Sequence, residues 1–263
     1  MHFTIATWNI NSVRLREPLV LQLLRETSPD VLCLQECKSP VESIPVDGFA
    51  GLGYDRMLAR GQKGYNGVLI LSRLPIEDLG SRDFCGKGDA RHVAGRLPNG
   101  VAIHNFYVPA GGDIPDPDQN AKFAHKLAFL DEMETWFETE PTGPAILVGD
   151  LNIAPREDDV WNHRALLKVV SHTPVEVERL DAVRRSGDWV DVTRHHVPEG
   201  RLYSWWSYRA RDWSASDRGR RLDHVWATPD IAARSRSSRI LRSVRGWEAP
   251  SDHVPVFATF ELD

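Results

Sequence analysis

A series of short apolar runs restricts this chain to a fold built largely from buried strands. Each run is six to nine residues long, is rich in Val, Ile, Phe and Trp, and stops at polar or turn-forming residues. Runs of this length and composition are typical of buried β-strands. The predicted strands are Phe3–Ile10, Val31–Glu36, Gly67–Ser72, Val101–Val108, Ala145–Asp150, Leu222–Thr228 and Val254–Leu262.

Two segments between these runs repeat apolar residues at helical spacing instead, namely Arg16–Glu26 and Asn120–Thr139. No linker or composition break divides the chain, and helices alternate with strands in both halves. We therefore expect one α/β domain over residues 1–263, in which two sheets pack together under covering helices. The apolar side chains of the second helix are interpreted as core: Phe123, Leu127, Leu130, Met133, Trp136 and Phe137.

Composition and targeting signals narrow the class of protein. The chain is 41% hydrophobic and 26% charged, which is ordinary for a globular domain. Its first residues carry no secretory pattern, and no apolar stretch approaches the roughly 20 residues of a membrane span. Three cysteines are too few for a disulfide framework. We expect a cytoplasmic protein without membrane contact, and a monomer by default.

The net charge of −5 argues against nucleic acid as a partner, so the distribution of the charges along the chain decides whether one region could still bind it. Residues 200–245 differ from this average, since they hold eleven arginines and four aspartates. Phosphate binding depends on the local field, so this segment is a candidate nucleic-acid surface. A solvated arginine-rich surface is the alternative interpretation.

Polar side chains recur where the apolar runs stop. Each alone has a structural explanation, such as a cap, an Asx turn or a satisfied core histidine. Together, carboxylates and amides are the oxygen ligands that Mg²⁺ prefers, whereas the sequence has no zinc-type cluster of Cys and His. One histidine beside aspartates suits phosphate contact or proton transfer. These candidate residues are Asn9, Glu36, Asp150, Asn152, Asp223, Asp252 and His253.

Nine blocks occur in one order along essentially the whole chain: TWNINSVR, PDVLCLQECK, GQKGYNGVLILSR, NFYVPAG, KFAHKLAFLDEM, VGDLNIAP, YSWWSYR, RLDHVWAT and PSDHVPV. In these blocks the chain resembles the exonuclease III branch of the endonuclease/exonuclease/phosphatase superfamily. The resemblance implies a four-layer α/β sandwich, in which two mixed β-sheets pack face to face and are flanked by helices. It places the active site at one edge of the paired sheets.

The resemblance also implies a metal site and its ligands. Glu36 would be the principal ligand of Mg²⁺, for which Mn²⁺ would substitute, with Asn9 and Asp252 close by. Asp150 and Asn152 would adjoin the metal while they position the attacking water and the scissile phosphate.

The same resemblance assigns the catalytic side chains. Asp150 is the best candidate for the general base, although it could instead protonate the leaving oxygen. His253 would contact the phosphate, and Asp223 would orient its imidazole. Tyr107 would bond the phosphate or assist the leaving group. This set suits phosphodiester hydrolysis, because its groups oppose the negative charge that develops on the phosphate and the leaving oxygen.

Residues 201–221 interleave arginines with aromatic side chains, which can hold backbone phosphates and stack on bases. Trp205 resembles the aromatic residue that lines the pocket for a base-free sugar in the family. Core packing of the aromatics and plain surface exposure of the cations are the alternatives. The predicted substrate contacts are Trp205, Lys63, Tyr65, Lys122, Arg209 and Arg221.

These patterns predict a magnesium-dependent DNA repair phosphodiesterase. Its substrates would be double-stranded DNA with abasic sites, cut on the 5′ side to leave a 3′-OH, and DNA with blocked 3′ ends. A 3′-to-5′ exonuclease activity that trims 3′ ends of double-stranded DNA would accompany this abasic-site incision. The loop after Tyr107 reads Val108-Pro109-Ala110 and lacks the amide common in the family, which leaves the balance of the two activities open. A phosphoesterase acting on another substrate and a DNA-binding protein without catalysis are the rival hypotheses.

Overall fold

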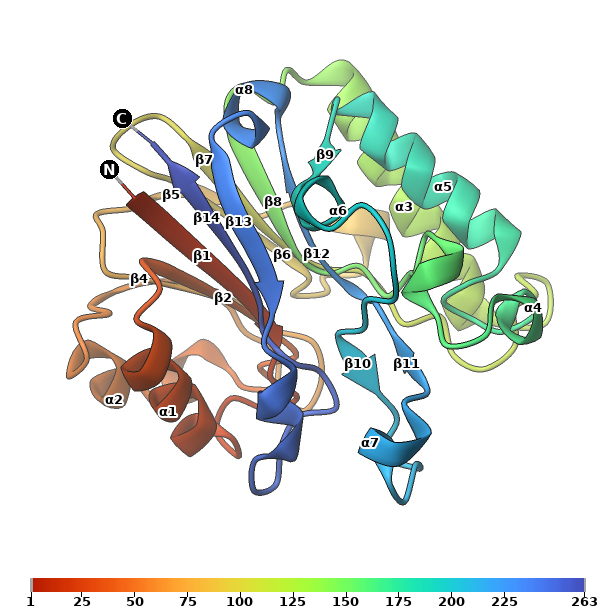
Figure 1. Ribbon diagram of the computed structural model, residues 1–263. Helices are drawn as coiled ribbons and strands as arrows, with labels where there is room; N and C mark the ends of the chain where they lie inside the picture. Colours follow the sequence, from red (N-terminus) through yellow and green to blue (C-terminus); the bar gives the residue numbers. More distant parts are fainter. Residues whose placement is uncertain (1, 263) are drawn as a thin grey trace.

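Two six-stranded sheets dominate the computed structural model, which describes residues 2–262 (Figure 1). In the first sheet the strand order is β13-β14-β1-β2-β4-β3. Only β1 and β2 run parallel, so the sheet is mixed. Its strands are β1 (His2–Asn9), β2 (Val31–Gln35), β3 (Arg56–Arg60), β4 (Val68–Ser72), β13 (Ser235–Ile240) and β14 (Val256–Glu261).

The second sheet has the order β5-β6-β7-β8-β12-β9, and its only parallel pair is β7 with β8. A separate antiparallel pair, β10 (Trp205–Trp206) with β11 (Gly219–Arg220), extends beyond the sheets in Figure 1. The strands of the second sheet are β5 (Glu77–Gly80), β6 (His92–Arg96), β7 (Ala102–Tyr107), β8 (Ala145–Asp150), β9 (Val190–Asp191) and β12 (Asp223–Ala227).

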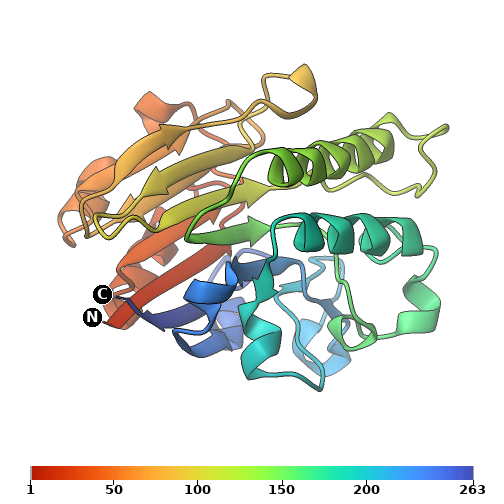
Figure 2. The same ribbon diagram turned by 90° about the horizontal axis from the view of Figure 1, so that it is seen from above.

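Helices cover the outer face of each sheet. In Figure 1, α1 and α2 lie on the first sheet, whereas α3 and α5 lie on the second, and Figure 2 shows α3 beside α5. This order of helix, sheet, sheet and helix confirms the four-layer α/β sandwich. The helices are α1 (Glu17–Thr27), α2 (Val46–Ala50), α3 (Ala121–Thr139), α4 (His163–Leu166), α5 (Pro174–Ser186), α6 (Val192–His196), α7 (Trp213–Ser216) and α8 (Pro229–Ala232).

Strand periodicity explains how the layers are held together. Successive side chains of a strand point to opposite faces, so β1 serves two cores at once. Phe3 and Ile5 pack between the sheets, whereas Ala6 and Trp8 pack toward α1. Because both faces of the central strands are buried, their sequences are apolar runs without polar alternation.

All seven predicted strands are present, and both predicted helices begin and end within about one residue of their predicted bounds. Asn120 caps α3 by accepting a hydrogen bond from the backbone N–H of Lys122. Apolar runs do not mark edge strands such as β13, because the residues of this strand are mostly polar. Nor do they mark α5, which carries few apolar residues and begins at a Thr173–Glu176 capping box.

The prediction that Arg221 contacts substrate is wrong. Its side chain is 0% exposed and pairs with Asp159 (Nε to Oδ1, 2.8 Å) and Asp191 (Nη2 to Oδ2, 2.8 Å). Burial by itself would raise the pKa of Asp159, but the guanidinium groups of Arg221 and Arg194 hold that pKa below its usual value. Arg221 therefore fixes η3 (Glu157–Asp159) and β9 against the start of β12.

No helix within residues 2–262 is long and apolar enough to cross a membrane. The three cysteines are free thiols, two of them buried, and burial raises the pKa of the partly exposed Cys85 to about 11. The structure thus agrees with the interpretation that they form no disulfide.

We expect Arg221→Met to lower the free energy of unfolding by about 3 kcal/mol, because it removes the shared partner of the buried Asp159 and the partly buried Asp191. Urea denaturation followed by circular dichroism measures this difference. Arg236→Met, which breaks an exposed pair with Glu261, is the matched control and should change stability far less. A stability of Arg221→Met equal to that of the unmodified protein would contradict the structural role.

Candidate active site

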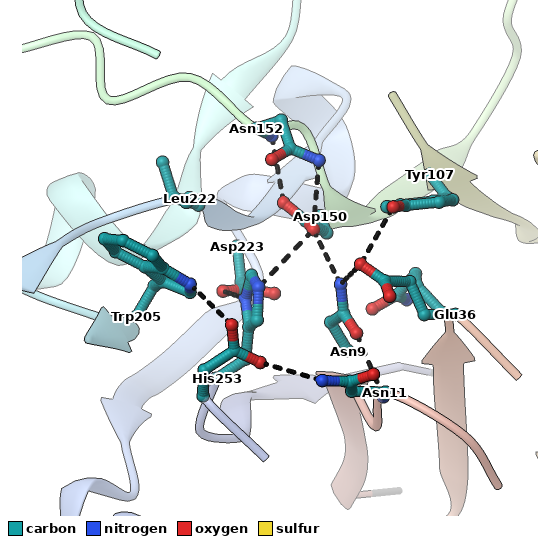
Figure 3. Close-up of polar contacts among 12 residues, drawn as sticks. Asn9, Asn11, Glu36, Tyr107, Asp150, Asn152, Trp205, Leu222, Asp223 and His253 are labelled. Carbon is teal, nitrogen blue, oxygen red and sulfur yellow. Dashed lines mark hydrogen bonds and ion pairs between the residues drawn. The ribbon is translucent and has the colours of Figure 1, made fainter. Parts of the chain in front are cut away.

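Strand register brings the predicted site residues to one edge of the sandwich. Asn9 ends β1 and Glu36 follows β2, and these two strands are parallel, so their carboxyl ends meet. In the second sheet, Tyr107 and Asp150 end the parallel strands β7 and β8 as direct partners. Asp223 begins β12 opposite Asp150. Side chains from both sheets therefore converge at this edge (Figure 3).

Glu36 lies at the centre of the first group of contacts. Its Oε1 accepts hydrogen bonds from the Asn9 amide (2.9 Å) and the Tyr107 hydroxyl (2.8 Å), and its Oε2 lies 2.8 Å from the Lys38 ammonium. Burial by itself would raise the pKa of Glu36, but Lys38 and Asn9 lower it below its usual value. Glu36 is therefore a carboxylate anion held in one orientation.

The backbone at Glu36 is in the left-handed region, with φ 51°. This conformation is uncommon for a residue with a β-carbon. Backbone bonds on both sides hold it, because the Glu36 carbonyl accepts from the Ser12 N–H (2.7 Å) and the Cys37 N–H donates to the Gly67 carbonyl (3.0 Å). The turn directs the Glu36 side chain away from the core.

Asp150 is fully buried and lies between the contacts around Glu36 and the contacts around His253. Its Oδ2 accepts from the amides of Asn9 (2.8 Å) and Asn152 (3.1 Å), and its Oδ1 accepts from the Asn152 backbone N–H (2.9 Å). Burial raises the pKa of Asp150 to about 7. The carboxyl group can therefore exchange a proton near neutral pH.

His253 lies between two carboxylates. Its Nδ1 is 2.8 Å from Asp223 Oδ2, and its Nε2 is 3.7 Å from Asp150 Oδ2. Burial by itself would lower the pKa of His253, but Asp223 and Asp150 raise it to about 10. The imidazole is thus a cation that can contact a phosphate oxygen.

The oxygen-rich half of the site fits a hard divalent cation. The Glu36 side chain is 19% exposed, whereas Asp150 is fully buried, and Glu36 Oε2 lies 2.8 Å from the Lys38 ammonium. Asn9 and Asp252 direct their oxygens elsewhere, since Asn9 Oδ1 accepts from Asn11 and the Asp252 oxygens accept from Asn11 and Trp205. Glu36 is the residue whose carboxylate best suits a first ligand.

A second group also has the proximity that a metal needs. Asp150, Asp223 and His253 each offer one ligand atom within 4.8 Å of the others. We interpret this group as a proton-transfer set, because His253 already bonds Asp223 and because Mg²⁺ prefers oxygen over nitrogen.

A cavity of about 710 Å³ opens over these groups. Glu36, Asn152 and His253 line one part of it, and Trp205 and Leu222 line another. Figure 3 shows Trp205 and Leu222 on the side of the site away from Glu36 and Tyr107. The cavity can therefore hold a phosphate with an attached sugar-sized fragment.

The other predicted substrate contacts are distributed more widely. Arg209 is exposed and lines the cavity. Lys63 and Tyr65 are exposed in the loop between β3 and β4, and Lys122 is exposed in the first turn of α3. None of these three lines the cavity, so any contact they make would be with a more extended substrate.

The whole-chain comparison decides the family. Residues 6–253 match the profile of the endonuclease/exonuclease/phosphatase family. This chain belongs to that family. Exodeoxyribonuclease III of Haemophilus influenzae is 26% identical, over 97% of this chain and 98% of the relative.

Solved structures of the family agree closely with the fold. An AP endonuclease from Archaeoglobus fulgidus is 31% identical with a TM-score of 0.91, covering 99% of this chain and 100% of that structure. A Neisseria 3′ phosphatase bound to a product DNA hairpin is 31% identical with a TM-score of 0.90, covering 99% of both. The prediction of an exonuclease III-type hydrolase acting on DNA is confirmed.

Several residues that shape this nuclease site carry no sequence signal of their own. Ser204 donates a hydrogen bond to Asp223 Oδ2 (2.6 Å), the oxygen that also contacts His253. The buried Lys126 donates to the backbone carbonyl of Asn152 (2.8 Å) and pairs with the buried Glu176. Only one feature of the sequence could have indicated Lys126. It is a charged residue at a buried position of the helix α3.

We expect the His253 imidazole to stay protonated until about pH 10, because two carboxylates stabilise its cation. Nitrogen-15 NMR of the metal-free protein measures this titration directly. Asp223→Asn should lower the pKa of His253, since it removes the nearest negative charge. His104 is the internal control, because burial lowers its pKa to about 4 and it should stay neutral in the same spectra. A His253 ring that titrates near its ordinary value of about 6.5 would contradict this arrangement.

Proposed function

We propose that this protein is a DNA repair phosphodiesterase that hydrolyses the backbone on the 5′ side of abasic sites and removes blocking groups from 3′ ends. The observation that carries the proposal is that His253, which lies between Asp223 and Asp150, lines the same cavity as Glu36. An imidazolium and a carboxylate-bound cation on the same phosphate would oppose the charge that develops during hydrolysis.

In this proposal, His253 binds a nonbridging oxygen of the scissile phosphate, and Asp223 keeps the imidazole oriented and charged. Asn152 donates its side-chain N–H bonds to Val108 and Asp150, which holds the Asp150 carboxylate at the base of the site. Asp150 then accepts a proton from the attacking water, a role that its raised pKa favours. Burial and neighbouring negative charge raise the pKa of Tyr107 well above its usual value, so its hydroxyl stays protonated as a donor.

We propose Mg²⁺ as the metal, with Mn²⁺ as a substitute, and Glu36 as its principal ligand. When bound, such an ion would neutralise charge on the phosphate and the leaving oxygen. The chain's own contribution is to hold Glu36 through Asn9 and Tyr107.

The substrate follows from the cavity and the relatives. Trp205 and Leu222 form an apolar wall beside the phosphate-binding groups, which suits a sugar without its base. One similar structure is named an AP endonuclease, and another is named a 3′ phosphatase and is bound to a product DNA hairpin. We propose DNA with abasic sites or blocked 3′ ends as the substrate and a monomer as the active form.

We expect metal-dependent incision of a 5′-labelled duplex that carries one reduced abasic analogue, which cannot break by β-elimination. One labelled product ending on the 5′ side of the lesion, formed in Mg²⁺ and not in EDTA, is the expected result. An undamaged duplex of the same sequence is the control. A ladder from the 3′ ends of both duplexes would replace the abasic assignment with an exonuclease. If neither the abasic duplex nor the undamaged duplex were cut in Mg²⁺, the result would favour a phosphoesterase with another substrate or a DNA-binding protein without catalysis.

We expect His253→Ala and Asp150→Ala to lower kcat on the abasic duplex by at least ~10²-fold, because the first removes the cation at the phosphate and the second removes the acceptor of the water proton. Glu36→Gln should raise the Mg²⁺ concentration needed for half-maximal rate, since it removes the anionic ligand. Thermal unfolding checks that all three variants fold. Near-normal turnover in all three would reject the assigned site.

A further inference from the structure

Arg220 is a cation in the wall of the active-site cavity that has no carboxylate partner within residues 2–262. Its Nη1 donates to two neutral acceptors, the Val170 carbonyl (2.9 Å) and the Ser171 hydroxyl (2.7 Å). Its Nε is buried and has no hydrogen-bond partner. The buried Nε is out of reach of a ligand, but the guanidinium lines the cavity with only neutral acceptors beside it, so an anion that enters the cavity would be stabilised there.

The local charge balance supports the same conclusion. Glu176 is the carboxylate that most influences Arg220, but it already pairs with Lys126 (Nζ to Oε1, 2.5 Å). The one carboxylate near Arg220 is thus already paired with the buried Lys126, which leaves the positive charge of the partly buried Arg220 without an ion-pair partner. Burial lowers the pKa of Arg220 without removing that charge, because guanidinium stays protonated near neutral pH.

The position of Arg220 relative to the phosphate site is fixed by β-pairing. Arg220 is the direct partner of Trp205 in the β10–β11 pair, and its guanidinium lies 5.2 Å from the centre of the indole ring. Trp205 in turn forms a β-bridge with His253. A substituent that is attached to a phosphate at His253 and extends to the Trp205 side of the cavity therefore approaches Arg220.

We propose that Arg220 is a specificity-determining residue that binds a carboxylate carried by the sugar fragment at a blocked 3′ end, as in a 3′-phosphoglycolate. This inference rests on the proposed function and specifies which blocked ends the site prefers. A base-free sugar offers no carboxylate in the cavity, whereas an oxidised sugar fragment does. Arginine suits this ligand because its N–H groups match the geometry of a carboxylate.

The reaction is the same hydrolysis. The water oxygen bonds the phosphorus, the bond between phosphorus and the DNA 3′ oxygen breaks, and that oxygen takes a proton. The products are a 3′-OH end and free phosphoglycolate, whose carboxylate stays paired with Arg220 until release.

The test compares kcat/KM of the unmodified protein and Arg220→Leu on three duplexes. The first ends in 3′-phosphoglycolate, the second in the matched neutral ester with a hydroxymethyl group in place of the carboxylate, and the third carries an internal reduced abasic site. Arg220→Leu should lose about 10-fold to 100-fold on the first and less than about 3-fold on the second. Arg220→Lys, which keeps the charge but not the planar group, should lose less than Arg220→Leu on the first.

Arg218→Leu is the matched control, because Arg218 lines the same cavity, is exposed and stacks on Trp161 at 4.8 Å. It should lower kcat/KM equally on all three duplexes. Equal losses for Arg220→Leu on the first two duplexes, or no loss on either, would overturn the proposal. A loss confined to the internal abasic site would assign the anion to a flanking phosphate and would overturn it as well.

Calorimetry separates this inference from the proposed function, because it needs no turnover. Free phosphoglycolate should bind the unmodified protein more tightly than inorganic phosphate does, and Arg220→Leu should remove that difference. Equal binding of the two anions by the unmodified protein would overturn the role of Arg220 even if the enzyme is active. Inactivity on all three duplexes together with the expected binding difference would reject the proposed function and leave the carboxylate site in place.

Discussion

The side-chain amide of Asn9 holds the two halves of the active site together. It donates to Glu36, which follows a strand of its own sheet, and to Asp150 in the facing sheet, so one planar group fixes the distance between these two carboxylates. The geometry is possible because both sheets end at the same edge, with the parallel pairs β1–β2 and β7–β8 placing their carboxyl ends there. An error in the register of either sheet would separate these groups.

A second polar contact between the two sheets joins Gln35, next to Glu36 in the sequence, to Asn105. Gln35 donates to the Asn105 side chain (2.7 Å), and Asn105 donates to backbone carbonyls of β2 and β4 (3.0 Å each). Both side chains are fully buried between the sheets. Buried amides favour one alignment over others, because a shift would leave the N–H donors of Gln35 and Asn105 without acceptors. The sheets are thus aligned by polar contacts at the edge where the chemistry takes place.

Some arginines of the arginine-rich segment stabilise the fold, and others line the cavity. Arg221 forms buried ion pairs. Arg242 pairs with Asp217 and stacks on Trp206. Arg236 pairs with Glu261. Arg209, Arg218 and Arg220 line the cavity. A chain of negative net charge can therefore present a locally cationic wall to a phosphate, because field strength at the site depends on the few unpaired cations.

The sequence by itself determined the layer architecture, since strand-length apolar runs and helical periodicity follow from burial on known faces. It also located the polar residues at strand ends, and its ordered motifs indicated the family. Tertiary structure alone decided that Asp150 and Asp223 flank His253, because this depends on β8 and β12 pairing in register. It also decided that Arg221 is internal while its neighbour Arg220 faces the cavity. Adjacent residues at this strand boundary point to opposite sides, and only the packing of η3 and β9 shows which side is covered.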